Sequence, residues 1–284
     1  MWFFKLNTMK HLVCIILLLL NFAANAQTLT KLWETEPLMD KPESAVYDRT
    51  NKVIYVSNIN GKYCTKDGNG FISKVALDGT ILNLNWITGL DSPQGLALFC
   101  DHLYVADVDH VIVIDVQKGI VEKRYHAEDA VFLNDIAADT NGYVYVSDCK
   151  ANRIYRFKNS KLDVWLNDSK LQGPNGLLCE RKKMMLLNMG EGTIYRVDKK
   201  TNALTEFCSG IKNLDGVVPD GKGGYFVSGA WQGEIYHIDS KGEKRLILNF
   251  GTEKVITADI EYIPEKQLLI VPTLSKTVMG YRWE

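Results

Sequence analysis

The chain has 284 residues and a formal net charge of -1, with 46% hydrophobic and 24% charged residues. These values are typical of a globular protein with enough apolar surface for a sizeable core, and they exclude a disordered chain. Lys and Arg are scattered along the sequence, so the basic stripe that nucleic-acid binding requires is missing. We therefore expect neither a nucleic acid nor an anionic membrane surface as a partner.

The first 26 residues differ from the rest of the chain. Two lysines precede an apolar run at residues 12–20, and the small residues Ala24 and Ala26 supply a cleavage site. This pattern is typical of a secretory signal peptide, and the run is shorter than the roughly 20 apolar residues of a membrane span. We predict cleavage between Ala26 and Gln27. The mature protein, residues 27–284, is then expected in the periplasm or outside the cell, without insertion in a membrane.

Six segments of the mature chain resemble one another. Each begins with a short apolar strand that carries a polar residue near its start, and a second strand rich in aromatic and branched residues follows after a turn. The marked polar residues follow one another at intervals of 51, 40, 41, 40 and 44 residues: Glu43, Gln94, Asn134, Asn175, Asp215 and Asp259. A period of about 40–45 residues is that of a four-stranded propeller blade. The sequence therefore predicts an all-β protein, a six-bladed β-propeller of four-stranded blades, as one domain over residues 27–284.

The two ends of the mature chain complement each other. The last period has only three strands before Glu284, whereas residues 29–34 form an additional strand that has no blade of its own. We predict that this N-terminal strand completes blade six by pairing with residues 278–283. Such closure removes two sheet edges that would otherwise invite aggregation.

The marked polar residues occupy equivalent places at the start of the strand nearest the propeller axis. Strand alternation and propeller symmetry turn them inward at similar height, which forms a ring of carboxylates and amides. Such oxygen ligands suit a hard cation, and Ca²⁺ tolerates six to eight of them. The sequence thus predicts a divalent metal in the channel, Ca²⁺ first, with Zn²⁺ and Mg²⁺ as alternatives. A water-filled polar channel stays open as the other interpretation, because pairs such as Asn175-Gly176 are also common in turns.

With these residues in place, the mature chain resembles the regucalcin/gluconolactonase family of six-bladed propellers over essentially its whole length. The resemblance rests on Pro-Glu-Ser-Ala-Val-Tyr at 42–47, Asn134-Asp135, Gly-Pro-Asn-Gly-Leu at 173–177, Asp215-Gly216 and Gly-Tyr-Phe-Val at 224–227. It implies a catalytic divalent cation, usually calcium or zinc, that Glu43, Asn175 and Asp215 bind directly and Asn134 binds directly or through water. It also implies that Asp215 is the general base or the nucleophile.

The chain departs from the family at the substrate pocket. Phe132 stands where lactonase members carry an Arg that grips a sugar-acid substrate, and Ile136 stands where they carry a glycine. We expect Phe132 to line the substrate pocket together with Gln94 and Asp259. Because Phe offers only apolar and stacking contacts, the expected substrate carries an apolar or aromatic group.

Two functions stay open on the sequence alone. The first is a metal-dependent hydrolase of a small-molecule lactone or related ester, in which the cation polarises the carbonyl while Asp215 activates a water or attacks directly. The second is a non-catalytic propeller, similar to NHL-type modules or strictosidine-synthase-like proteins, that binds a ligand or a protein partner. The fold cannot choose between them. Joint retention of Glu43, Asn134, Asn175 and Asp215 favours the enzyme, and Phe132 favours the binding module; the sequence identifies no protein partner.

Overall fold

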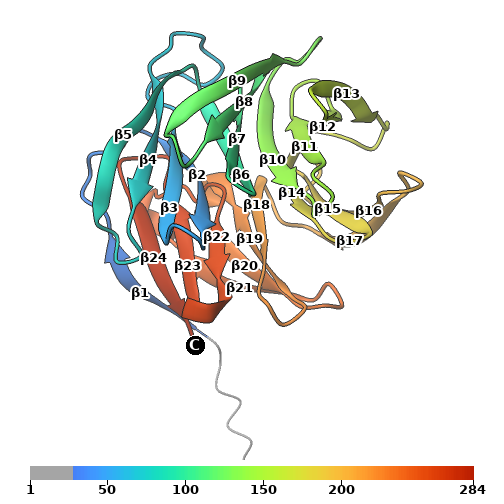
Figure 1. Ribbon diagram of the computed structural model, residues 1–284. Helices are drawn as coiled ribbons and strands as arrows, with labels where there is room; N and C mark the ends of the chain where they lie inside the picture. The colour runs from blue at the N-terminus through green and yellow to red at the C-terminus, as the bar shows by residue number, and fades with distance from the viewer. Residues whose placement is uncertain (1–27) are drawn as a thin grey trace, which may run out of the picture.

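A computed structural model describes residues 28–284. The predicted signal peptide, residues 1–26, lies outside the described residues. Six four-stranded antiparallel sheets are arranged as blades around one axis (Figure 1), and the helical content of the described residues is three short 3-10 helices. The predicted six-bladed, all-β propeller is confirmed. Over residues 28–284 no helix has the length and apolar character needed to cross a membrane.

In each of the first five blades, four consecutive strands follow one another from the axis to the rim, and in blade six the first strand of the chain takes the place at the rim. The first three blades contain β2 (Pro42–Asp48), β3 (Val53–Asn58), β4 (Gly70–Val75) and β5 (Ile81–Leu90); β6 (Pro93–Phe99), β7 (His102–Asp107), β8 (His110–Asp115) and β9 (Ile120–His126); β10 (Leu133–Ala138), β11 (Val144–Asp148), β12 (Arg153–Lys158) and β13 (Lys161–Leu166). The fourth and fifth contain β14 (Pro174–Cys179), β15 (Lys183–Asn188), β16 (Thr193–Asp198) and β17 (Leu204–Ser209); β18 (Leu214–Pro219), β19 (Tyr225–Gly229), η1 (Ala230–Gln232), β20 (Glu234–Ile238) and β21 (Lys244–Asn249). The sixth contains η2 (Gly251–Glu253), β22 (Glu261–Ile263), η3 (Pro264–Lys266), β23 (Leu268–Pro272), β24 (Val278–Trp283) and, at the rim, β1 (Leu29–Glu34).

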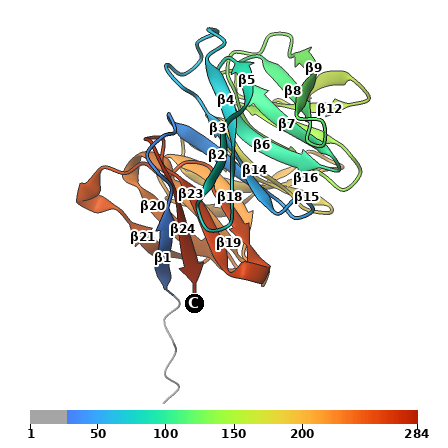
Figure 2. The same cartoon turned by 60° about the vertical axis from the view of Figure 1, so that its left-hand side comes forward.

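Blade six is closed by the two ends of the chain. Strand β1 pairs antiparallel with β24, from Leu29 opposite Trp283 to Glu34 opposite Met279. Figures 1 and 2 show the first strand beside the last one. The predicted closure is therefore confirmed. The indole of Trp33 packs on the backbone of Gly280, where a Cβ would collide with it, so glycine is required at this seam.

The hydrophobic core is divided into six clusters, and each cluster fills the space between two consecutive blades. Tyr55 and Ile112 belong to the cluster between blades one and two, and Phe226 and Trp283 to the one between blades five and six. Fully burying one such side chain contributes about 1.5–3 kcal/mol. Because every blade packs on two neighbours, the starts of the inner strands are held at fixed positions around the axis.

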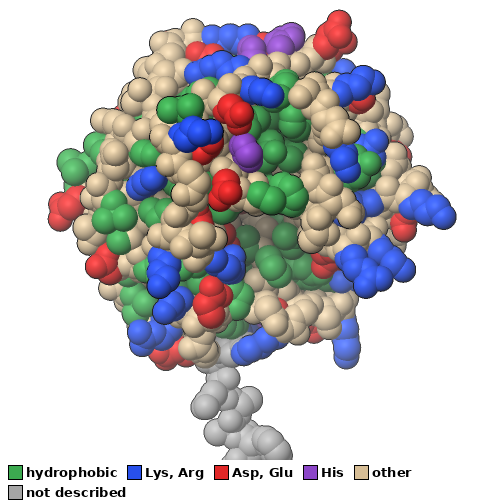
Figure 3. Space-filling model, viewed as in Figure 1, with side chains coloured by type: hydrophobic (Ala, Val, Ile, Leu, Met, Phe, Trp, Pro, Cys, Tyr) green, Lys and Arg blue, Asp and Glu red, His purple; other side chains and the backbone are tan. Residues whose placement is uncertain are grey.

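Charged side chains of both signs are spread over the face in Figure 3. Lys and Arg are intermixed there with Asp and Glu, and hydrophobic side chains gather beside a hollow near the centre. This face carries no patch of one charge, in agreement with the scattered charges of the sequence. The hollow is where the blades converge on the channel.

Candidate functional site

One end of the channel holds a cavity of about 180 Å³, which we call the ring cavity. Five of the six marked polar residues line it, and each comes from the inner strand of a different blade, β2, β6, β10, β14 and β18: Glu43, Gln94, Asn134, Asn175 and Asp215. We call these five the ring residues. All of them are buried. The repeat thus brings together side chains that are up to 172 residues apart in the sequence, from Glu43 to Asp215.

A β-bulge in each of the five inner strands that carry a ring residue turns this residue toward the axis. In blade three Leu133 pairs with Asp148, the register then shifts, and pairing resumes at Ile136 opposite Val146. The same shift occurs at the ring residue of the other four blades. A bulge leaves its extra residue unpaired and re-aims it. Simple alternation, which we used on the sequence, did not reveal this bulge.

Glycine follows the ring residue in several blades because the neighbouring inner strand is close. A Cβ at Gly176 would collide with the carbonyl oxygen of Asp215 in the next blade. In blade three the corresponding residue is Asp135, whose carboxylate accepts hydrogen bonds from the backbone N–H of Ile136 at 2.7 Å and of Leu177 in blade four at 2.6 Å. The residue after each ring position therefore joins adjacent blades, which fixes the ring residues relative to one another.

Asp259 does not lie with the ring residues, so its expected place is corrected. Asp259 has in blade six the position that Asp135 has in blade three, one residue after the ring position. A Cβ at Gly216 would meet Asp259, just as a Cβ at Gly95 would meet Asp135. Its carboxylate accepts a hydrogen bond from Ser44 Oγ at 2.5 Å.

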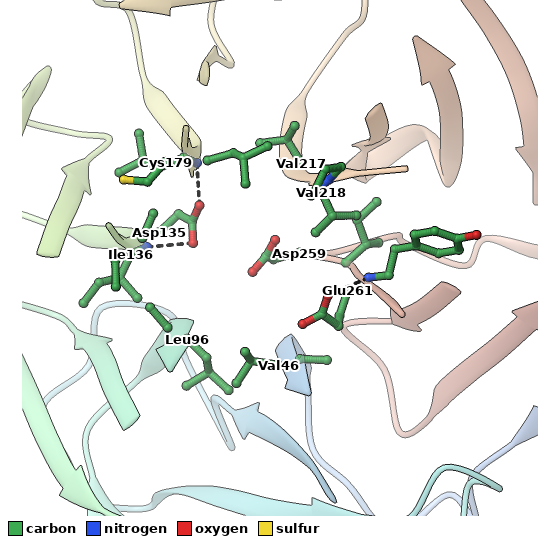
Figure 4. A pocket seen from close by; sticks show the side chains of 18 of the residues that line it. Val46, Leu96, Asp135, Ile136, Cys179, Val217, Val218, Asp259 and Glu261 are labelled. Carbon is green, nitrogen blue, oxygen red and sulfur yellow. Dashed lines mark hydrogen bonds between the residues drawn. The ribbon is translucent and has the colours of Figure 1, made fainter. Parts of the chain in front are cut away.

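Asp259 lines a second cavity of about 290 Å³ further along the inner strands, which we call the far cavity. Figure 4 shows its side chain pointing into that cavity, with Asp135 and Glu261 nearby. The ring position of blade six is instead held by Ala258, which is buried and has no side-chain oxygen to contribute.

The ring cavity concentrates buried oxygen atoms that have no hydrogen-bond partner. Among the described residues, five buried side-chain polar atoms lack one, and three of these are ring-residue oxygens: Glu43 Oε2, Asn134 Oδ1 and Asn175 Oδ1. An unsatisfied buried acceptor costs about 1–3 kcal/mol, so each one calls for an explanation. Oxygen atoms from a carboxylate and two amides at one cavity are a donor set that a hard divalent cation accepts. The residues present therefore fit the metal that the family resemblance implies.

The acidic ring residues are held in an environment that disfavours their charge. Burial raises the pKa of Glu43 well above its usual value, and repulsion from Asp215 adds to the shift. Burial raises the pKa of Asp215 to about 7, although a hydrogen bond from the Asn175 side chain opposes the shift. A bound cation would favour the ionised form of both.

Clusters of three or more His, Cys, Asp and Glu side chains suited to a metal are absent from residues 28–284. The ring residues do not form such a cluster, because two of the four predicted ligands, Asn134 and Asn175, are amides. The donor set is therefore mixed, with only Glu43 and Asp215 carrying carboxylates.

The wall of the ring cavity is apolar. Phe132 lines it as expected and is 8% exposed. Met189, Trp231 and Leu274 line it from the loops that follow the second strands of blades four, five and six. Gln94 donates its amide N–H groups to the carbonyl and hydroxyl oxygens of Ser92 at 3.0 and 3.1 Å. These side chains leave the ring oxygens facing a largely apolar space.

Sequence reasoning missed three residues of the cavity mouth. Tyr63 and Cys64 come from the β3–β4 loop, residues 59–69, whereas the equivalent loops of the other blades have five residues or fewer. The first interval of 51 residues was the available indication of this insertion. Lys150 lies in the turn after β11, with Nζ 5.1 Å from the centroid of the Phe132 ring. No pattern in the sequence predicts the direction of a turn side chain.

Comparisons with known proteins agree with this architecture. Over residues 41–260 the sequence matches the family described as SMP-30/Gluconolactonase/LRE-like region. A gluconolactonase from Xanthomonas campestris has a similar structure, with a TM-score of 0.70, 16% identity and coverage of 90% of this chain and 89% of that chain. A streptogramin B lyase has a TM-score of 0.67 at 12% identity, covering 91% of this chain and 98% of its own.

A virginiamycin B lyase from Staphylococcus aureus is also similar, with a TM-score of 0.61, 14% identity and coverage of 90% and 98%. At these identities the structures share the fold alone, and the fold accommodates both a gluconolactonase and lyases. The comparison with curated proteins found no match.

Proposed function

The chain belongs to the SMP-30/Gluconolactonase/LRE-like family, and on that premise we propose that it is a divalent-metal-dependent hydrolase of a lactone or ester. The observation that carries the proposal is the set of three partnerless buried oxygens, on Glu43, Asn134 and Asn175, beside Asp215 in one cavity. We propose Ca²⁺ as the metal, with Zn²⁺ and Mg²⁺ as alternatives. We also propose export by way of residues 1–26 to the periplasm or beyond the cell.

The ring residues divide between metal binding and proton transfer. Glu43, Asn175 and Asp215 would hold the cation directly, and Asn134 would do so directly or through a water. The cation would supply Lewis-acid polarisation of the substrate carbonyl. The oxygen of a water molecule bonds to the carbonyl carbon, and Asp215 accepts the proton that this water loses. The ester C–O bond then breaks, and the leaving alkoxide takes the proton from Asp215.

The position of Asp215 suits a general base. The Asp215 carboxylate is buried in the ring cavity beside Asn175, and its lone pairs can accept the proton of a water. The apolar wall formed by Phe132, Met189 and Trp231 limits competing bulk water and favours a substrate with an apolar portion. These contacts support hydrolysis of a compact ester over binding of a large polar partner.

A panel of aliphatic, aromatic and sugar lactones, with aryl esters, assayed in millimolar calcium tests the proposal. We expect turnover that chelation abolishes and calcium restores, and that Asp215→Ala removes. Asp163→Ala, at an exposed aspartate of β13 far from the ring cavity, is the matched control and should keep full activity. Absence of turnover across the panel in correctly folded, calcium-loaded protein would contradict the proposal and favour the binding propeller.

A further inference from the structure

The ring cavity has one basic side chain among the described residues that line it, Lys150. It is exposed at the mouth of the cavity, in the turn between β11 and β12. Its ammonium contacts the sulfur of Cys64 at 3.2 Å and lies over the ring of Phe132 at 5.1 Å from the centroid. Neither group is a carboxylate, and within residues 28–284 the Lys150 ammonium forms no ion pair. Its charge is therefore available to a ligand.

The cavity places opposite chemistry at its two ends. Partnerless oxygens and two carboxyl groups lie at the buried ring, whereas the exposed ammonium of Lys150 lies at the mouth, and the buried side chain of Phe132 and the partly buried side chain of Leu274 line the same cavity. A molecule whose carbonyl reaches the ring would extend along the apolar wall and end near Lys150. An ammonium offers three donors and a full charge to an anion at that end.

We propose that the substrate is an amphipathic lactone or ester with a carboxylate at the end remote from the reacting carbonyl, and that Lys150 determines this specificity. The inference rests on the proposed function, since it names the substrate class of the same cavity. It also revises the expectation drawn from Phe132, because the cation absent at position 132 is provided from position 150 beside the same ring. Phe132 then contributes the apolar contact and Lys150 the charge.

A purely structural role for Lys150 has a different signature. A lysine stem often covers an aromatic ring while its charge stays in water, and such packing acts equally on every substrate. Charge recognition acts only on the substrate that carries the anion. Two substrates that differ in this charge alone therefore separate the two roles.

The test uses a matched pair of lactones, one with a 4-carboxyphenyl substituent and one with a 4-carbamoylphenyl substituent. For the wild type in calcium we expect kcat/KM to favour the carboxylate about three- to tenfold. The effect is modest because the Lys150 ammonium is exposed to water before the substrate binds. Lys150→Gln should remove this preference through a higher KM, with kcat unchanged, because Lys150 is exposed at the mouth whereas the ring residues are buried. Lys150→Arg should retain most of it.

Lys158→Gln is the control, since Lys158 also places its ammonium over a ring, that of Tyr143 at 3.7 Å, but outside the ring cavity. This variant should keep the wild-type preference. Equal kcat/KM for the two lactones in the wild type, or an equal loss for both in Lys150→Gln, would overturn the inference while leaving the hydrolase proposal intact.

Calorimetry with the two corresponding lactams separates this inference from the hydrolase proposal, because lactams need only bind. We expect the carboxyphenyl lactam to bind Lys150→Gln about three- to tenfold more weakly than the wild type, and the carbamoylphenyl lactam to bind both equally. If no lactone is turned over but this difference appears, the hydrolase proposal fails and the recognition stands. If both proteins bind the carboxyphenyl lactam equally, the recognition fails.

Discussion

Glu43 combines two properties that a buried glutamate seldom has together. One carboxylate oxygen lacks a hydrogen-bond partner, and burial together with repulsion from Asp215 raises the pKa of the group. Without a cation, the folded protein is destabilised when Glu43 ionises. With a cation, the same ionised group becomes a ligand. The ionised Glu43 carboxylate therefore lowers the stability of the metal-free protein but raises its affinity for the cation.

Substitution Glu43→Gln separates these two effects. We expect the metal-free variant to melt roughly 2–4 °C above the wild type at pH 8, because Gln puts no ionisable group in this buried position. Calcium affinity measured by calorimetry should fall at least about tenfold, since one of the two proposed carboxylate ligands is lost. Glu36→Gln, at an exposed position, should change neither quantity. A variant less stable than the wild type in chelator, with calcium affinity preserved, would contradict this account.

Residue by residue, the sequence predicted the ring well where a blade carries both a polar residue and its bulge. Glu43, Gln94, Asn134, Asn175 and Asp215 share the ring cavity because the inner strands that carry them shift register at the same point. Spacing alone cannot fix a position to within one residue when the interval between blades varies. Blade six was therefore misaligned by one, and Asp259 was expected where Ala258 lies.

Lys150 was beyond the reach of the sequence for another reason. Its side chain leaves a turn, where no strand alternation or helical period dictates its direction, and only the folded chain brings it over Phe132. Position 132 carries no cation, as the sequence indicates, but Lys150 supplies one to the same cavity.

At the scale of the element, the inner strands are spaced by glycine. Gly176→Ala would drive a Cβ into the carbonyl oxygen of Asp215, so we expect β14 and β18 to separate and unfolding free energy to fall by about 1–3 kcal/mol. Calcium affinity should fall as well, because Asn175 and Asp215 flank the displaced contact. Urea unfolding with and without calcium measures both.

The control for this prediction is Gly68→Asn on the β3–β4 loop. A side chain at Gly68 meets nothing within 4 Å, and Asn tolerates its φ of 67°. This variant should remain close to the wild type. A Gly176→Ala protein with wild-type stability and calcium affinity would refute the claim that backbone crowding sets the ring.

Closure of blade six is the second element-scale feature with a measurable consequence. Deleting residues 28–34 removes β1, exposes the edge of β24 and leaves the Trp33 site at Gly280 empty. We expect the melting temperature to fall by at least about 5 °C and the protein to self-associate through the new edge. Scanning calorimetry with light scattering checks both, and an unchanged melting curve from a monomeric truncated protein would speak against the role of β1.

For the whole molecule, the channel collects five buried carboxyl groups whose pKa values are all raised. Burial raises the pKa of Asp135, Asp215 and Glu261 to about 7 each. It raises the pKa of Glu43 and of Asp259 well above their usual values, with added repulsion from Asp215 and Asp135 respectively. The folded protein therefore binds these protons more tightly than the unfolded chain does.

The stability of the metal-free protein should consequently fall as pH rises. Because the folded state holds more protons than the unfolded state between about pH 4.5 and pH 7, the free energy of unfolding decreases with pH across that window. In chelator we expect a lower melting temperature at pH 8 than at pH 5, and millimolar calcium should recover the loss at pH 8. Equal or higher stability at pH 8 in chelator would show that these groups do not govern the channel.

The central claim is that the ring residues bind one divalent cation, and anomalous X-ray diffraction from crystals grown in millimolar calcium tests it most directly. We predict a single anomalous peak between Glu43, Asn175 and Asp215, with metal–oxygen distances of roughly 2.3–2.6 Å, and its loss in Asp215→Ala. A ring cavity without a peak under these conditions, with the three side chains pointing apart, would contradict the account.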